Sequence, residues 1–397
     1  MRGMVRAACT AAIATGLALG LGACGSESKE RAPAAAGGKE RSKPASFFQQ
    51  RVDQLYAGAS YSEPEGDAPK PQPGKKLWAI TYGLAASAGA EAAEGAKEAG
   101  EAIGWDVRVF DGKFDPNNYL TGIRQAIAAK ADAIYLYAID CPVVKAGLED
   151  AKEAGVAVVA AEAADCDDLK PGAPSLFTTD NGAYNGGPFT SKKLTYGPWI
   201  ENWGAAQASA IIAHTKGKAK IIDFYETDTE STLRLDVGLR REVAACAECE
   251  IVETVKFTGA DFGPSLQAKA EQALLQHPEA NAVFGSYDAP ITSGIAAAVR
   301  ASGRSDKLYV SGGEGDPPNV ELVREGKGQN GGVADPVAWQ SFAAVDALNR
   351  VFQGQKSAPN GIGFMLWDKD HNLPQKGEQV QPPIDFKSAY FRSWGVK

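Results

Sequence analysis

Short apolar runs alternate with amphipathic segments along the chain from Lys75 onward. The runs are rich in β-branched and aromatic residues, whereas the segments between them repeat apolar residues at helical spacing. The runs occupy residues 77–82, 106–110, 133–137 and 156–161, and the helical segments occupy residues 88–103, 116–127 and 143–154. Continuous apolar strands that alternate with helices are typical of a parallel sheet that is covered on both faces.

The same alternation resumes after a polar break at residues 180–182. Strands are expected at residues 221–224, 251–255, 282–285, 308–310 and 332–334, with helices at residues 229–245 and 265–276 and a further helix after Pro336. The pattern therefore predicts an α/β fold made of two lobes, each a doubly wound parallel sheet.

Polar side chains follow the predicted strands where each strand ends. Asp140 and Glu162 follow two strands of the first series, and Tyr287, Glu314 and Asp335 follow three strands of the second. Ligands of open parallel sheets bind beyond the carboxyl ends of the strands. We therefore expect a binding crevice with several acidic walls.

The start of the chain has the features of a secretory signal. Basic residues precede an apolar stretch at residues 7–21, and small residues lead to Cys24. The ending Leu-Gly-Ala-Cys resembles the bacterial lipobox, which implies a signal peptide of residues 1–23 and lipidation of Cys24; an ordinary signal peptide is the alternative. Residues 24–74 are then expected to be a lipid anchor and flexible linker at the outer face of the cytoplasmic membrane, with a short helix at residues 47–56.

The composition is that of a soluble globular protein, with 44% apolar and 23% charged residues. The net charge is −8 and no basic run interleaves with aromatic residues, so nucleic acid is not an expected partner. The histidines His214, His277 and His371 follow no ligand spacing. We therefore expect no metal and no cofactor.

Four cysteines remain beyond Cys24, and export places them in an oxidising compartment. They allow three pairings. We favour a local Cys246–Cys249 bridge and a Cys141–Cys166 bridge between neighbouring strand ends. A redox or zinc motif at Cys246 and Cys249 is the weaker alternative, because no second Cys or His pair accompanies it.

Several segments, taken in order, resemble one known family. Residues 155–162 match a strand that ends in a ligand-binding acid, and residues 260–262 match a loop with a stacking aromatic residue. Residues 277–284 precede Tyr287-Asp288, which stand at the family's Asn-Asp, and residues 311–315 stand at its Gly-Phe-Asp-Gly. Residues 334–336 lie near its hinge acid, and residues 393–395 are similar to a common ending. On these segments the chain resembles the type I periplasmic solute-binding proteins, specifically the ribose-type sugar-binding lipoproteins of ABC importers, from Lys75 to the end.

The resemblance implies two lobes joined by three hinge crossings, with the ligand between them. The N-terminal lobe would comprise residues 75–182 and 336–366, and the C-terminal lobe residues 183–335 and 367–397. It further implies a monomer without enzymatic activity that binds a small molecule, a sugar or polyol, and delivers it to an ABC permease and ATPase. The expected ligand-binding residues are Tyr82, Leu84, Asp140, Glu162, Arg234, Phe262, Tyr287, Glu314 and Asp335.

The chain departs from the family at its arginines. Ala163 follows Glu162 where the family usually has Arg, and Arg234 alone remains to serve as the other pocket Arg. Ionised carboxylates only accept hydrogen bonds. The crevice therefore favours a ligand rich in donors, namely a polyol, an amino sugar or another cation.

An aromatic segment at residues 184–203 is longer than the family's usual connection. Its Trp199 and Trp203 could line the ligand, because aromatic rings offer contact area at low entropic cost. A surface loop held down by its own aromatic residues is the alternative.

Other functions stay open at this point. Glu162 and Glu314 could form an acid/base pair as in glycosidases, although the mature chain lacks G-x-S-x-G, H-E-x-x-H and Walker A motifs. A receptor that presents its ligand to a membrane sensor would share the fold. So would a binder of a non-carbohydrate cationic or aromatic solute.

Overall fold

The computed structural model describes residues 42–170 and 172–396. The expected signal peptide and Cys24 lie outside these residues. The first sheet is fully parallel, with strand order β2-β1-β3-β4. Its strands are β1 (Lys76–Thr81), β2 (Asp106–Asp111), β3 (Ala133–Tyr137) and β4 (Ala157–Ala161), and its helices are α2 (Ser87–Ala102), α3 (Pro116–Ala128) and α4 (Cys141–Glu153).

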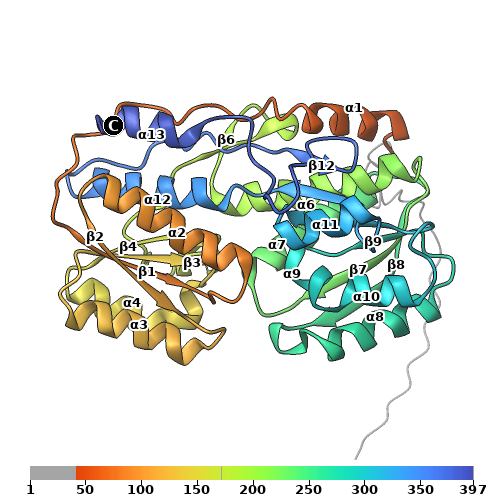
Figure 1. Cartoon of the computed structure of the whole chain (residues 1–397), viewed down its shortest axis with the longest axis horizontal. Helices are drawn as coiled ribbons and strands as arrows, with labels where there is room; N and C mark the ends of the chain where they lie inside the picture. Colours follow the sequence, from red (N-terminus) through yellow and green to blue (C-terminus); the bar gives the residue numbers. More distant parts are fainter. Residues whose placement is uncertain (1–41, 171, 397) are drawn as a thin grey trace, which may run out of the picture. The chain divides into compact units, whose positions relative to one another are not determined.

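The local sequence accounts for these elements. Every residue of β3 and β4 is buried, as expected for continuous apolar strands between two helical layers. Helix α2 turns a face of alanines and glycines inward, so that α12 (Val337–Val351) approaches it closely. Helix α3 begins at Asp115, whose carboxylate accepts the N–H of Asn117 while Pro116 occupies the first turn. In Figure 1, α2 and α12 lie on one side of this sheet, and α3 and α4 lie on the other.

The second sheet has strand order β12-β11-β10-β9-β7-β8, with only β12 antiparallel. Its strands are β7 (Lys220–Glu226), β8 (Glu250–Phe257), β9 (Ala282–Phe284), β10 (Tyr309–Glu314), β11 (Gly331–Ala334) and β12 (Leu366–Asp368). Its helices are α6 (Tyr196–His214), α7 (Glu230–Ala244), α8 (Pro264–Gln276), α9 (Asp288–Pro290), α10 (Ala296–Ala301) and α11 (Pro317–Glu325). The two-lobed α/β architecture that the sequence predicted is therefore confirmed.

The chain passes between the two sheets after β4, after β11 and before β12, and residues at these passages bond to one another. Asn360 donates to the carbonyl oxygens of Asn181 and Gly182 (both 3.3 Å), and its own carbonyl accepts from the indole of Trp339 (2.9 Å). Residues from all three crossing regions thus form one buried hinge.

The described segment before Lys75 is folded, so the expectation of a flexible linker is wrong for residues 42–74, whereas the short helix expected at residues 47–56 is present. Helix α1 (Ala45–Tyr56) packs on α6, with Phe48 and Leu55 fully buried. Residues 57–75 then run along α12, where Asn349 donates to the carbonyl oxygen of Pro69 (2.9 Å). The prolines that suggested a linker instead give an extended segment that is held by side chains of α12.

The end of the chain also departs from the expected lobe boundaries. Strand β12 belongs to the second sheet, but α13 (Phe386–Trp394) packs on α12 of the first lobe. The Trp339 and Phe386 rings stack with centroids 5.0 Å apart. The assignment of residues 367–397 to the C-terminal lobe is therefore wrong for α13.

The remaining elements are short. They are α5 (Cys166–Leu169), the two-stranded pair β5 (Tyr184–Asn185) and β6 (Lys193–Leu194), the 3-10 turns η1 (Gly187–Phe189) and η2 (Gly259–Asp261), and the π-helical turn η3 (Ile291–Ile295). None of the helices in residues 42–170 and 172–396 is long and apolar enough to cross a bilayer.

Candidate functional site

Four strand ends share an unusual backbone conformation. Ala138 and Glu162 follow β3 and β4, and Ser286 and Glu314 lie at the ends of β9 and β10; their φ angles are between 52° and 59°. Residues with side chains rarely adopt this left-handed region, and such residues cluster at functional sites. Two of the four carry carboxylates, one from each sheet.

Glu162 and Asp335 are joined by one glutamine. The side-chain nitrogen of Gln340, in the first turn of α12, donates to Glu162 Oε1 and to Asp335 Oδ1 (both 2.7 Å). Burial, followed by the charge of Asp335, raises the pKa of Glu162 well above its usual range. Burial also raises the pKa of Asp335, to about 6. Burial therefore favours the protonated form of both carboxyls.

A second acidic group lies at the ends of β9 and β10. Carboxylate oxygens of Asp288, Glu314 and Asp316 all lie within 4.8 Å of one another. Burial raises the pKa of Glu314, and the charges of Asp316, Asp288 and Glu162 raise it further. The backbone N–H of Asp335 donates to the carbonyl oxygen of Glu314 (3.0 Å), so this second group lies directly beside the Glu162–Asp335 pair.

Asp288 has a structural task within this group. Its carboxylate accepts backbone N–H groups of Gly313 (3.1 Å), Gly315 (2.8 Å) and Asp316 (2.9 Å), and the side-chain amide of Gln329 (3.0 Å). These bonds fix the turn that carries Glu314 and leave Asp288 little capacity for a ligand.

Tyrosines surround the acidic groups. Tyr82 and Tyr137 follow or end strands of the first sheet, with ring centroids 6.0 Å apart, and Phe114 meets Tyr82 edge-on at 5.3 Å. From the second lobe, burial and then the charge of Glu226, at the end of β7, raise the pKa of the Tyr287 hydroxyl well above its usual range. Burial raises the pKa of Glu226 to about 8.

Several buried polar atoms at this site have no hydrogen-bond partner among the described residues. They are Tyr137 Oη, Glu226 Oε2 and Asp316 Oδ1. Their residues are 0%, 2% and 6% exposed, respectively. Because an unpaired buried polar atom is costly, these atoms point to a polar ligand that would complete them.

No lysine, arginine or histidine within residues 42–170 and 172–396 forms an ion pair with Glu162, Asp335, Glu314 or Asp316. Buried carboxylates are ordinarily paired. This site therefore gathers several buried carboxyl groups with no cationic side chain from the described part of the chain to pair with them.

Two hydrogen bonds connect the lobes beside the site. Asp140 Oδ2 accepts the N–H of Glu230 at the start of α7 (3.0 Å), while Asp140 Oδ1 accepts the N–H of Ala164 (2.8 Å). Ser231 Oγ donates to the carbonyl oxygen of Glu162 (3.1 Å). Asp140, expected to bind ligand, thus has both oxygens bound to backbone and links the two lobes in this structure.

Arg234 lies outside the acidic groups. Its guanidinium pairs with Glu201 and with Glu230 (both 3.1 Å), next to a small cavity that Asp168 and Tyr196 help to line. Arg234, which the family resemblance suggested for the pocket, is therefore already paired with two carboxylates of this chain.

Leu84 and Phe262 occupy more peripheral positions. Leu84 is 36% exposed, and its N–H donates to Asp111 (3.0 Å). Phe262 is half-buried and lies 6.2 Å from Phe257, centroid to centroid. The predicted ligand contacts of both residues stay predictions.

The aromatic segment packs on itself. Trp199 stacks on Tyr184 at 4.6 Å and on Phe364 at 5.6 Å, and Trp199 and Trp203 are 0% and 1% exposed. Trp203 lies against Gly313 of β10. This geometry corresponds to the packing alternative, with Trp203 directly behind the turn that carries Glu314.

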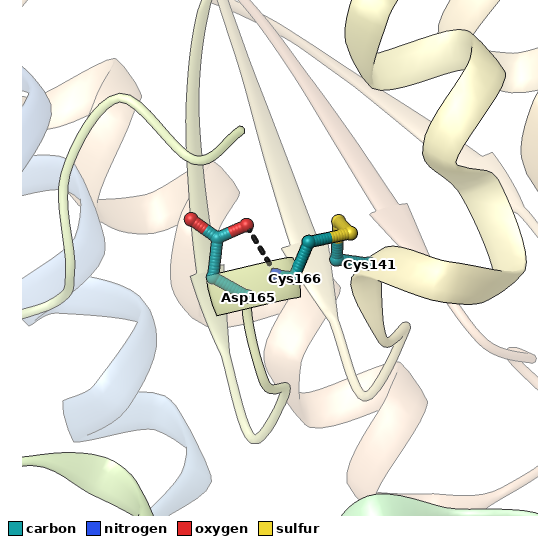
Figure 2. Close-up of side chains that lie close together, drawn as sticks. All are labelled: Cys141, Asp165 and Cys166. Atoms are coloured by element: carbon teal, nitrogen blue, oxygen red, sulfur yellow. Dashed lines mark hydrogen bonds between the residues drawn. A yellow bond between two sulfur atoms is a disulfide. The ribbon is translucent and has the colours of Figure 1, made fainter. Parts of the chain in front are cut away.

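Figure 2 shows the clip beside Asp140, where a disulfide joins Cys141 at the start of α4 to Cys166 of α5. Asp165 accepts the N–H of Cys166 (2.7 Å) and the N–H groups of Leu176 and Phe177. The two sulfurs are bonded to each other, so this group of Cys and Asp offers no thiolate to a metal. A second disulfide joins Cys246 and Cys249.

Sequence reasoning missed Tyr137, Gln340, Asp316 and Glu226. Tyr137 and Glu226 are the last residues of β3 and β7, so the rule that placed Glu162 could also have found them. Asp316 precedes Pro317-Pro318, a helix start at the edge of the crevice. Gln340 gave no signal, because only the path of α12 brings it to Glu162.

The two facing sets of strand ends and the hinge define a two-lobed binding protein of the α/β type. A family model described as the periplasmic binding protein domain matches residues 85–356. The chain belongs to this family, which confirms the resemblance found in the sequence. No curated protein matches the chain.

Solved structures show the same fold at low sequence identity. An ABC sugar transporter subunit from Rhodobacter sphaeroides 2.4.1 has a TM-score of 0.60 and 18% identity, over 75% of this chain and 99% of that chain. An ABC transporter periplasmic solute-binding protein from Actinobacillus succinogenes 130z, with bound D-allose, has a TM-score of 0.62 and 18% identity, over 75% and 98%. One from Bacillus halodurans C-125, with bound myo-inositol, has a TM-score of 0.61 and 17% identity, over 77% and 97%.

Proposed function

We propose that this protein captures a small sugar or polyol between its two lobes and delivers it to an ABC importer. The observation that carries the proposal is the set of unpartnered buried atoms, Tyr137 Oη, Glu226 Oε2 and Asp316 Oδ1, where the strand ends of the two sheets meet. A polyhydroxylated solute supplies both donors and acceptors, so it can satisfy the tyrosine and the carboxylates together.

The structural neighbours support this solute class. Among them are proteins with bound D-allose, allitol and myo-inositol. The aromatic rings of Tyr82 and Phe114 agree with it, because such rings stack against the apolar faces of sugars. The role is binding, without chemistry, without a cofactor and as a monomer.

The proposal includes attachment to the membrane through a lipid on Cys24, with the folded body on the outer face of the cytoplasmic membrane. Mass spectrometry of the mature N-terminus tests this part, and a Cys24→Ala variant should appear in the culture medium. Retention of that variant in the membrane fraction would contradict a lipid anchor.

A thermal-shift screen of sugars and polyols, followed by calorimetry, tests the proposed binding. A ligand at 100 times its Kd adds about 2.7 kcal/mol to the free energy of unfolding, which is a readily measured shift in Tm. Gln340→Met should weaken the hit at least tenfold, because it removes the donor shared by Glu162 and Asp335. The exposed Gln125→Met on α3 is the matched control. Binding confined to apolar or anionic compounds would overturn the proposal.

A further inference from the structure

The carboxyl groups of the site narrow the expected solute class further than the fold alone does. Glu162 and Asp335 meet at Gln340, Glu314 and Asp316 lie on the facing turn, and no described cationic side chain pairs with any of them. With a neutral sugar, these acids could be neutralised only by protons once the lobes enclose them, whereas a cationic solute would compensate their ionised forms.

We propose that the solute of this site is a cationic polyol, meaning a hydroxylated small molecule with an ammonium group that binds between Glu162–Asp335 and Glu314–Asp316. This inference rests on the proposed function and narrows its solute class. Two buried polar atoms without a partner support this assignment. Asp316 Oδ1, in a residue 6% exposed, would accept from the ammonium, and the hydroxyl of Tyr137, 0% exposed, would bond to a hydroxyl of the solute.

An ammonium group fits these carboxylates better than a metal ion does. Among the residues that the structure describes, the only three carboxylates here with oxygens within 4.8 Å of one another are those of Asp288, Glu314 and Asp316. The oxygens of Asp288 already accept N–H groups of Gly313, Gly315 and Asp316 and the amide of Gln329. The remaining Glu314 and Asp316 are too few for the six or more oxygen ligands of calcium, whereas an ammonium needs only three acceptors.

The test uses matched pairs of solutes that differ by one group, with the full mature protein. Sorbitol is compared with 1-amino-1-deoxysorbitol, and D-glucose and D-allose are compared with their 6-amino-6-deoxy analogues, by thermal shift and calorimetry. We expect at least one amine to bind at least tenfold more tightly than its neutral partner. Neutral partners that bind as tightly as the amines would overturn this inference and leave the proposed function intact.

Other outcomes are equally decisive. If neither series binds but calcium or magnesium shifts the Tm, both the inference and the proposed sugar or polyol function fail. N-acetylated amines serve as the charge control, since they keep the nitrogen and lose the charge; equal binding of both forms would contradict the proposed charge recognition.

Variants locate the ammonium. Glu314→Gln and, separately, Asp316→Asn should each weaken the amine at least tenfold and leave the neutral partner unchanged or improved. Glu153→Gln, on the exposed face of α4, is the matched control and should change neither. An equal loss for amine and neutral partner would indicate a structural role for these acids and contradict charge recognition.

The pH dependence gives a second readout that needs no variant. The groups facing the ammonium are the carboxyls of Glu162, Glu314, Asp316, Asp335, Asp288 and Glu226 and the hydroxyls of Tyr82, Tyr137 and Tyr287. An alkyl ammonium stays charged from pH 5.5 to 7.5, whereas Asp316 and Asp335, whose pKa values burial raises to about 6, lose protons in that range. Amine affinity should rise at least fivefold over this interval, and an amine affinity that is flat or falls would contradict the inference.

Discussion

At the scale of single residues, the site depends on a glycine that places a carboxylate. A Cβ on Gly313 would lie 1.8 Å from the ring carbon Cη2 of Trp203, so no other residue fits without a shift. Gly313 precedes Glu314, whose left-handed backbone turns its side chain toward Asp316. The contact between Gly313 and Trp203 therefore fixes the position of the turn that carries Glu314.

Gly313→Ala should therefore lower both stability and affinity. The added methyl overpacks against a fully buried indole, which costs about 1–3 kcal/mol of unfolding free energy, and it displaces Glu314. Urea unfolding and calorimetry with the identified solute measure the two effects. Gly147→Ala on α4, whose added Cβ would lie 3.2 Å from the side chain of Ile123 and outside the acidic groups, is the matched control. A Gly313→Ala protein with unchanged affinity would contradict this role for Trp203.

Residue identities predicted only part of this site. The rule that ligands lie beyond strand ends correctly placed Glu162, Glu314 and Asp335 together. The same rule predicted that Asp140 binds the ligand. The sequence does not reveal that the N–H at the start of α7 lies 3.0 Å from the Asp140 carboxylate. Backbone N–H groups of distant elements carry no sequence signal.

At the scale of elements, Asp140 connects the two lobes through helix α7. A carboxylate at a helix start satisfies a free N–H and interacts favourably with the helix dipole. Here the carboxylate comes from the first lobe and the N–H of Glu230 from the second. The bond is therefore specific to the arrangement in which the lobes are in contact.

Asp140→Ala should weaken solute binding about tenfold or more, because a hydrogen bond to a charged group contributes about 1.5–3 kcal/mol and this one is lost when the lobes part. Stopped-flow measurements should assign most of the effect to faster dissociation. Asp115→Ala removes a comparable cap within the first lobe and should lower stability alone. Equal affinity of the Asp140→Ala and wild-type proteins would sink the proposed link.

The Cys141–Cys166 disulfide stabilises the elements around Asp140. It closes a loop with a sequence separation of 25 and joins α4 to α5. The double variant Cys141→Ser/Cys166→Ser should lose about 3 kcal/mol of unfolding free energy, as measured by urea titration.

The second disulfide offers the control. Cys246 and Cys249 have a sequence separation of only 3, so their removal should cost less, because a short loop restricts the unfolded chain less. A larger loss from the Cys246→Ser/Cys249→Ser variant would contradict this assignment.

Helix α1 illustrates why the folded body was expected to begin only at Lys75, although a short helix was predicted at residues 47–56. Its apolar residues Phe48, Val52 and Leu55 follow a helical period, but the preceding Ala/Gly/Pro-rich stretch and the following prolines resemble a linker. The helix is ordered by its contact with α6 of a lobe that begins far along the chain. Local composition cannot report such a contact.

At the scale of the whole molecule, the buried acids make the stability of the solute-free protein depend on pH. Burial raises the pKa values of Asp335 and Asp316 to about 6, and that of Glu226 to about 8. Unfolded carboxyls titrate near pH 4. The folded state thus holds more protons between pH 4 and 8, so the stability that they contribute is present below pH 4 and is lost as the pH rises through 6 to 8.

The solute-free protein should accordingly have a lower free energy of unfolding at pH 8 than at pH 5. Urea titrations at both values measure the difference. Asp335→Asn should reduce this slope because it removes one titrating group, whereas Glu153→Gln should leave it unchanged. A stability that rises from pH 5 to pH 8 would contradict the uncompensated burial of these acids.

The overall architecture was the most predictable level, because strand and helix periods repeat along both lobes. The segments that pass between the lobes were less predictable from the sequence. Beyond the three expected crossings, residues 57–75 lead from α1 to β1, and residues 369–385 lead from β12 to α13. Both segments lie outside residues 85–356, the range that matches the family model.

These two additional passages have a mechanical consequence. Arg350 of α12 donates to the carbonyl oxygen of Gly66 (3.2 Å), and Val380 donates its N–H to the carbonyl oxygen of Gly315 (3.0 Å), so both segments are fastened as well as threaded across the boundary. Any wide swing of the lobes must stretch or detach them, which raises the work of opening. We expect long residence times for a captured solute, with its release dependent on force supplied by the membrane complex.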